Sequence, residues 1–136
     1  LYNCYEVDNV KKIMIAFFIL LLCGCQNSYI NMNYDSFYKK MGNRESYILL
    51  LCNNDCNKYK KELPNKKQIY YMDINKLNDK EKLVVESQVF DFESLSTPSI
   101  IIVENGSLKS KKIGDINNDS VVNFLKDNKV LEEKNG

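Results

Sequence analysis

Two cysteines, Cys52 and Cys56, are separated by three residues in the stretch ILLLCNNDCNKYKKELP. Two thiols at this spacing allow three kinds of chemistry: reversible thiol–disulfide exchange, capture of a soft metal ion, or a structural disulfide. A disulfide that closes so short a loop stabilises a fold little through chain entropy, so a purely structural bond is a weak reason for this pair. The choice depends on the surrounding elements and on the compartment of the protein.

The other three cysteines lie near the N-terminus. Two lysines precede an uncharged apolar run over residues 13–22, which at about 1.5 Å per residue spans roughly half of a ~30 Å hydrocarbon core. The run ends in the sequence LCGC, which resembles a bacterial lipobox with Cys25 as the lipidated residue. We therefore expect residues 1–24 to be a lipoprotein signal peptide and the mature chain to begin at Cys25.

Residues 1–9 fit such a leader less well, because they carry two acidic residues where positive charge is usual. One hypothesis is that translation starts at Val10, from a GTG codon read as Met. The mature chain then keeps only Cys52 and Cys56 as free thiols, because Cys25 carries the lipid. The expected location is the extracytoplasmic face of the cell membrane, through a lipid anchor, where a disulfide can persist.

The folded domain is predicted over residues 34–130, after a lipidated polar tether over 25–33 and before a polar tail over 131–136. Apolar runs and periodic apolar residues predict its elements. In chain order these are a helix over 35–41, a strand over 46–51, a helix over 56–63, a strand over 68–74, a helix over 76–90, strands over 99–104 and 108–113, and a helix over 118–128. The cysteine pair therefore lies where the first strand enters a helix.

Some of these elements carry more specific expectations. The uninterrupted apolar run over 46–51 predicts a strand that is covered on both faces of its sheet. The helix over 76–90 is expected to bury Leu83 in its apolar stripe. The Asn105-Gly106 step predicts a tight hairpin, so the two strands beside it should be antiparallel.

The order α, β, α, β, α, β, β, α, with cysteines at the first strand-to-helix turn, resembles the thioredoxin fold. The resemblance extends over roughly residues 35–128 and rests on the cysteine pair, the Thr97-Pro98 step and Gly114 after the hairpin. It implies an α/β fold with a central mixed sheet of about four strands flanked by helices. It also implies a cis bond between Thr97 and Pro98 beside the cysteines, with the segment before Pro98 pairing with substrate backbone.

The chain departs from that family pattern at three points. The family usually has two residues between its cysteines and an aromatic residue before them, whereas this chain has three residues, Leu51 and no Trp. Many members place a buried carboxylate six residues before the first cysteine. The corresponding position here is Ser46 or Tyr47, and neither has a carboxylate. We therefore expect a thiol that is less activated than is usual in the family.

The identity of the attacking cysteine depends on where the helix begins. If Asn53 caps the helix, Cys52 lies exposed at the strand end and attacks, and Cys56 resolves the mixed disulfide. If Asn54 or Asp55 caps it, Cys56 lies in the first turn, where helix amides favour a thiolate. The first arrangement, with Cys52 attacking, is the one we expect.

Three functions follow from these patterns. The first is a membrane-anchored, extracytoplasmic thiol–disulfide oxidoreductase that acts on exported proteins or peptides, similar to the thioredoxin-like proteins that accompany bacteriocin export in Gram-positive bacteria. The second is a non-catalytic thioredoxin-like binding module at the cell surface. The third is copper handling, because the Sco family shares the Cys-x-x-x-Cys spacing, but its metal site also needs a His, and this chain has none.

Composition narrows the function further. The 19 basic residues nearly balance the 18 acidic ones, so no basic surface for a nucleic-acid partner is indicated. Without His there is no Ser-His or Cys-His catalysis. Asp73 and the acidic residues that follow it are interpreted as surface charges. We expect a monomer without cofactor or metal.

Overall fold

The computed structural model describes residues 29–131. Its elements follow the alternation that the sequence predicts, with one additional strand at the start. In chain order they are β1 (Tyr29–Asn31), α1 (Tyr34–Gly42), β2 (Tyr47–Cys52), the 3-10 helix η3 (Cys56–Glu62), β3 (Ile69–Asp73), the short 3-10 helix η4 (Ile74–Lys76), α2 (Asp79–Val89), β4 (Ser99–Glu104), β5 (Ser107–Ile113) and α3 (Asn118–Asp127).

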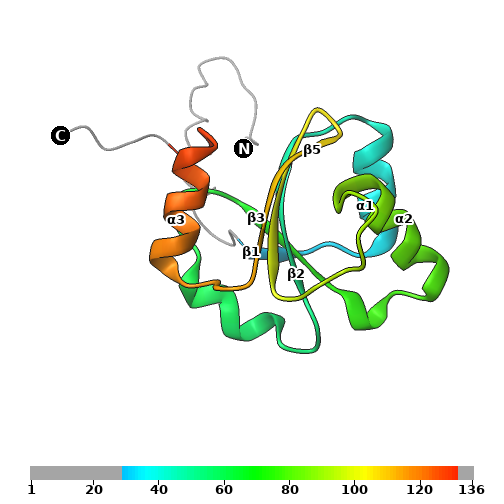
Figure 1. The fold of residues 1–136 in the computed structure, drawn as a ribbon, viewed down its shortest axis with the longest axis horizontal. Helices are drawn as coiled ribbons and strands as arrows, with labels where there is room; N and C mark the ends of the chain where they lie inside the picture. The colour runs from blue at the N-terminus through cyan, green and yellow to red at the C-terminus, as the bar shows by residue number, and fades with distance from the viewer. Residues whose placement is uncertain (1–28, 132–136) are drawn as a thin grey trace, which may run out of the picture.

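The strands form one mixed sheet in the order β1-β3-β2-β4-β5. β3 runs parallel to both β1 and β2, whereas β4 runs antiparallel to β2 and to β5. In Figure 1, α1 and α2 lie on one side of this sheet, and α3 lies on the other side together with η3. The result is a central sheet between two helical layers.

β2 is the central strand, and every one of its residues is buried. Successive side chains of a strand point to opposite faces of the sheet. Leu49 and Leu51 accordingly belong to the apolar core on the α1 and α2 side, whereas Leu50 and Cys52 belong to the core on the η3 and α3 side. This confirms the prediction of a strand covered on both faces, and it directs Cys52 towards η3.

The hairpin between β4 and β5 is also confirmed. Asn105 and Gly106 both have positive φ, at +52° and +82°, as a tight turn of this kind requires. A side chain at Gly106 would be strained at that φ and would approach the Cα atom of Arg44 to 3.0 Å. The turn joins β4, an inner strand beside β2, to the lysine-rich β5 at the edge of the sheet. Charge on an edge strand opposes pairing with another chain.

The prediction that residues 25–33 form a tether is wrong for residues 29–32. Tyr29–Asn31 pair with β3 as a fifth strand, and Met32 is buried in the core beside α1. The backbone N–H of Met32 donates to the carbonyl oxygen of Tyr71 at 2.8 Å. A strand of three residues is too short to show a periodic pattern, which is why sequence reasoning finds about four strands and not five.

Two helices also differ from their predictions. The helix after the cysteines is a 3-10 helix that begins at Cys56 and ends before Pro64. The predicted helix over 76–90 divides into η4 and α2, because Asn78 caps α2 in a capping box with Glu81. The apolar stripe expected for this helix also includes Leu77, Val85 and Val89, which are buried, but the expectation for Leu83 is wrong because it is 64% exposed.

The predicted signal peptide over residues 1–24, the lipidation residue Cys25 and most of the polar tail over 131–136 lie outside the described residues. Within residues 29–131, no helix has both the length and the apolar character needed to cross a bilayer.

Candidate active site

The disulfide between Cys52 and Cys56 lies where β2 ends and η3 begins. The two Cα atoms are 5.1 Å apart, which is within the usual range for disulfides. Both cysteines belong to the apolar cluster that η3 and α3 form against the sheet. The pair thus occupies the strand-to-helix turn that the sequence predicts.

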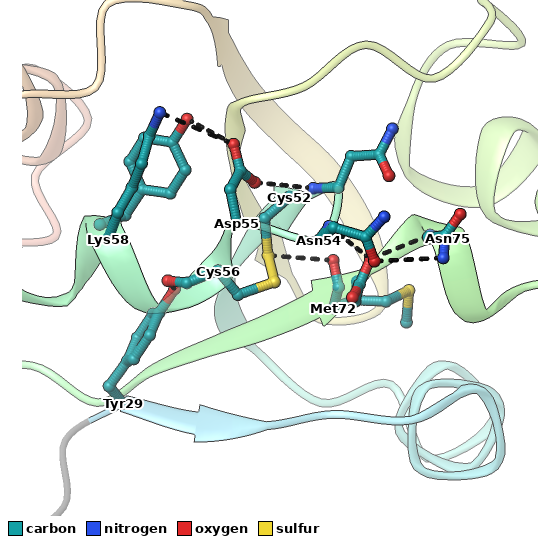
Figure 2. Close-up of a disulfide and its surroundings, with 11 residues drawn as sticks. Tyr29, Cys52, Asn54, Asp55, Cys56, Lys58, Met72 and Asn75 are labelled. Carbon is teal, nitrogen blue, oxygen red and sulfur yellow. Dashed lines mark hydrogen bonds and ion pairs between the residues drawn. A yellow bond between two sulfur atoms is a disulfide. The ribbon is translucent and has the colours of Figure 1, made fainter.

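Two carboxylates hold the turn between the cysteines (Figure 2). Asp55 Oδ1 accepts a hydrogen bond from the backbone N–H of Asn53 at 2.9 Å, and Asp73 Oδ1 accepts one from the backbone N–H of Asn54 at 3.0 Å. Asn54 has a φ of +63°, a left-handed conformation that Asn adopts more readily than most residues. These two hydrogen bonds and the left-handed conformation of Asn54 allow the turn to contain three residues between the cysteines where the family usually has two.

Asp73 is a residue of the site that sequence reasoning misses. Its Oδ1 also accepts from the backbone N–H of Asn75 at 3.0 Å, and the Asn75 side chain donates to Asn54 Oδ1 at 3.1 Å. Asp73 ends β3 and pairs in register with Cys52 of the parallel strand β2. Because parallel strands end at the same edge of a sheet, an acidic residue at the end of the second predicted strand is the signal that could have identified it.

Tyr29 of β1 is a second missed residue, and it fixes the backbone of Cys56. Its hydroxyl lies beside the Cys56 carbonyl oxygen (Figure 2) and donates to it at 2.6 Å. Its ring packs on Tyr71 with 4.5 Å between centroids. Burial raises the pKa of Tyr29 above its ordinary value, and the nearby Tyr71 and Asp55 raise it further. The hydroxyl therefore remains a donor well into alkaline conditions. Sequence reasoning overlooks Tyr29 because it assigns this residue to the tether.

The Asp55 carboxylate beside Cys56 is shared between two partners. The Tyr59 hydroxyl donates to Asp55 Oδ2 at 3.1 Å, and Lys58 Nζ lies 3.9 Å from the same oxygen. Burial and this hydrogen bond together raise the pKa of Tyr59. The charge next to Cys56 is therefore mixed, with the negative charge of Asp55 partly offset by Lys58.

Both cysteines are buried, and the small difference in their exposure runs in the opposite sense to the one expected. Cys52 is 0% exposed and Cys56 is 7% exposed. The Cys52 sulfur lies 3.5 Å from the carbonyl oxygen of Met72, an acceptor that favours the thiol over the thiolate once the disulfide is reduced. Asp55 is the residue that precedes η3, so Cys56 lies in its first turn. The prediction of Cys52 as an exposed cysteine at the strand end is therefore wrong.

The peptide bond between Thr97 and Pro98 is cis, as the resemblance implies. Ser99 pairs with Leu51 in the ladder between β4 and β2. The preceding residue, Pro98, is therefore next in register beside Cys52, at the edge of the sheet that carries the disulfide.

Gly114 fixes the position of this step. Its backbone N–H donates to the Pro98 carbonyl oxygen at 2.8 Å, and its φ is +77°, a conformation that favours glycine. Thr97 and Pro98 are both half-buried, so one side of the step remains accessible. The three features on which the resemblance rests therefore meet at one edge of the sheet.

The described residues offer little for a metal site. Within residues 29–131, no three side chains of His, Cys, Asp or Glu gather where they could share a metal ion. Two sulfurs are the soft donors at the candidate site, and here they are bonded to each other.

No family model and no curated protein matches the sequence. Solved structures do match, among them a protein described as having a thioredoxin fold, with a TM-score of 0.55 and 16% identity over 73% of this chain and 95% of that one. Thioredoxin f from spinach chloroplast matches with a TM-score of 0.51 and 15% identity, over 75% and 94% of the two chains. A thioredoxin from Malassezia sympodialis matches with a TM-score of 0.51 and 12% identity, over 76% and 92%.

The fold and the site together define a class of protein. The chain has a thioredoxin fold, with a mixed sheet of five strands flanked by helices. Within this fold, its Cys-x-x-x-Cys pair lies at disulfide distance at the end of the central strand. At these low identities the comparisons establish the fold alone.

Proposed function

We propose that this protein is a thiol–disulfide oxidoreductase. The observation that carries the proposal is the Cys52–Cys56 disulfide at the sheet edge where Pro98 is next in register. A disulfide across three residues stabilises the fold little, yet two carboxylates hold its turn in a defined conformation. Reversible chemistry at the disulfide accounts for this arrangement better than a structural bond does.

In the reducing direction, the Cys56 thiolate attacks one sulfur of a substrate disulfide. A mixed disulfide forms between Cys56 and the substrate, and the other substrate sulfur leaves as a thiolate and takes up a proton. Cys52 then loses its proton and attacks the Cys56 sulfur, which releases the second substrate thiolate and restores the protein disulfide. Two electrons pass from the protein to the substrate, and the reverse sequence oxidises a substrate dithiol.

The assignment of Cys56 as the attacking thiol follows from its surroundings. Cys56 is the more exposed of the pair, and substrate access is a condition for attack. The Met72 carbonyl oxygen beside Cys52 holds this residue as a thiol until the mixed disulfide has formed. This order is the reverse of the one that the sequence predicts, in which Cys52 attacks.

The substrate is proposed to be an exported protein or peptide, and Thr97 and Pro98 are proposed to bind its backbone. The step is only half-buried, and Pro98 is next in register beside Cys52, so a strand bound there would bring a substrate sulfur close to the cysteine pair. The paired lysines, the apolar run and the LCGC sequence of the leader support a lipid anchor on Cys25 and an extracytoplasmic location. Mass spectrometry of the mature N-terminal peptide, with or without a diacylglyceryl group on Cys25, tests this part.

Trapping of the mixed disulfide tests the reaction. The full chain is expected to catalyse the reduction of insulin by dithiothreitol. Cys52→Ser should accumulate a covalent complex with insulin through Cys56, because the resolving thiol is absent. Cys56→Ser is the matched control and should form little complex, because Cys52 is buried.

If the wild-type chain shows no turnover and neither variant forms a complex, the oxidoreductase proposal is wrong. The remaining function is then the non-catalytic binding module at the cell surface, for which the disulfide is dispensable. A complex that forms through Cys52 alone would keep the activity but overturn the assignment of Cys56.

A further inference from the structure

The surface beside Cys56 is strongly basic, although the whole chain carries a net charge of only +1. η3 and the loop that follows it contain five exposed lysines and a single acidic residue, Glu62. Glu62 accepts a hydrogen bond on Oε1 from the backbone N–H of Asn118 at 3.1 Å, so its carboxylate lies at the N-terminal end of α3. The five are Lys58, Lys60, Lys61, Lys66 and Lys67. Basic charge is therefore concentrated along η3 and the loop after it, and Asp55 beside Cys56 is the acidic residue at the start of this segment.

This basic face is hollowed, and we call it the lysine groove. Its larger part, of about 800 Å³, lies between the loop after η3 and α3, where Lys66 and Lys67 face Lys126 and Lys129. A smaller hollow beside η3 adjoins it and shares Asn65. The described residues that line the two hollows include no Asp or Glu, and Val122 and Val130 add apolar surface between the lysines.

The smaller hollow lies along η3, which starts at the redox site, whereas the larger hollow lies further away. Lys66 and Lys67 lie just before β3, which runs parallel to β2, so they lie towards the sheet edge opposite the disulfide. Lys58 is two residues from Cys56, and η3 advances about 2 Å per residue. Lys66 and Lys67 lie beyond the far end of η3, so an extended polypeptide that holds a cysteine at Cys56 needs at least about four further residues to reach them. Figure 1 shows α3 and η3 together on this side of the sheet.

We propose that the lysine groove binds an acidic, partly apolar segment of the substrate polypeptide and thereby selects the substrate. This inference rests on the proposed oxidoreductase function and adds its substrate class. Lysines without an acidic residue in the groove attract carboxylates, and a cluster of one charge raises the rate of encounter. The hollow shape and the apolar residues among its lining fit a polypeptide segment better than the surface of a bilayer.

The test uses the reduced full chain and two synthetic peptides of equal length. Each peptide contains one intramolecular disulfide, followed by a run of either Glu and Leu or Gln and Leu. Cys56 attacks the peptide disulfide and Cys52 resolves it, so the protein is oxidised and the peptide leaves as a dithiol. The second-order rate constant is measured at about 20 mM and about 300 mM salt, because added salt screens charges at the surface.

The Glu peptide is expected to react about tenfold faster than the Gln peptide at low salt, and the advantage should shrink at high salt. The double variant Lys66→Glu/Lys67→Glu should lose this preference and keep the rate with the Gln peptide. The control Lys76→Glu/Lys80→Glu makes the same charge change at two exposed lysines near α2 and should keep the preference.

Equal rates with both peptides, or a preference that the Lys66→Glu/Lys67→Glu variant retains, would overturn the proposal while leaving the redox function intact. If neither peptide reacts, the redox function has failed. The proposed peptide binding by the groove is then tested separately, by measuring the binding of a fluorescent Glu peptide to Cys52→Ser/Cys56→Ser. Binding that Lys66→Glu/Lys67→Glu abolishes supports it, and no binding refutes it. If phosphatidylglycerol vesicles bind through Lys66 and Lys67 but the Glu peptide does not, the groove is a lipid site and the proposal is refuted.

Discussion

Cys52 and Cys56 share one disulfide but lie in different surroundings. Cys52 is fully buried, and its sulfur lies 3.5 Å from the Met72 carbonyl oxygen, so both burial and this acceptor disfavour its thiolate. In the reduced protein we predict that iodoacetamide modifies Cys56 about tenfold faster than Cys52 at neutral pH. Mass spectrometry of the two cysteine peptides over time measures both rates. Equal rates, or faster modification of Cys52, would contradict the assignment of Cys56.

Tyr29 is predicted to contribute to stability through a single hydrogen bond. Tyr29→Phe removes the donor that lies 2.6 Å from the Cys56 carbonyl oxygen but keeps the ring that packs on Tyr71. The free energy of unfolding should fall by about 1 kcal/mol, as measured by urea denaturation. Tyr38→Phe is the control, because it removes a hydroxyl from a side chain that is 64% exposed. An equal effect of both substitutions would show that the bond to Cys56 does not matter.

Residues of the site differ in how readily the sequence reveals them. Cys52, Cys56 and the Thr97-Pro98 step are identified by type and spacing, and the sheet brings them to one edge. Asp73 is not identified in this way, because its role depends on the pairing of β3 with β2 and not on its neighbours in the chain. The exposure of each cysteine is equally hidden, because it depends on which residue begins η3.

At the scale of elements, the turn between β2 and η3 depends on the end of β3. Asp73→Ala removes the acceptor of two backbone N–H groups, those of Asn54 and Asn75. It should lower the free energy of unfolding by about 1 to 3 kcal/mol and increase the rate at which Cys56 is alkylated. Asp73→Asn keeps an oxygen at this position and should recover most of both effects. If Asn behaves as Ala does, the carboxylate acts through its charge and not as an acceptor.

Elements with a continuous or tightly bounded pattern are predicted best. β2 and β4 follow their apolar runs, and the turn between β4 and β5 follows from Asn105-Gly106. The three residues of β1 show no pattern, since they form a strand only by pairing with β3. The 3-10 geometry of η3 and the exposure of Leu83 are set by packing, which the periodicity of a single segment does not reveal.

At the scale of the whole molecule, folding buries a tyrosine in the core under α1 and α2. Burial raises the pKa of Tyr47 above its ordinary value near 10. Above about pH 10 the unfolded chain loses this proton before the folded protein does, so the stabilisation is complete below that pH and is lost as the pH rises.

Tyr47→Phe should therefore reduce the loss of stability between about pH 10 and pH 11 by roughly 1 kcal/mol. Urea denaturation at several pH values measures this, and Tyr38→Phe is the exposed control. A wild-type protein and a Tyr47→Phe variant that lose stability in parallel would contradict the prediction.

The distribution of charge is also a property of the whole molecule. The near balance of basic and acidic residues in the sequence excludes a uniformly basic protein, yet it conceals the lysine groove along η3 and α3. Composition gives only the net charge of the whole chain, whereas a binding partner contacts one face of the folded protein. The sequence therefore predicts the fold and the position of the cysteine pair better than it predicts what the site binds.

The most direct test of the central claim is a redox titration of the full chain, with the state of the Cys52–Cys56 pair measured by thiol alkylation and mass. For a thiol–disulfide oxidoreductase we expect a reversible two-electron couple with a potential between roughly −270 and −120 mV, the span of catalytic thiol–disulfide proteins. A value towards either end would indicate the direction of exchange. A disulfide well below about −300 mV, or two thiols that never pair, would contradict the oxidoreductase function.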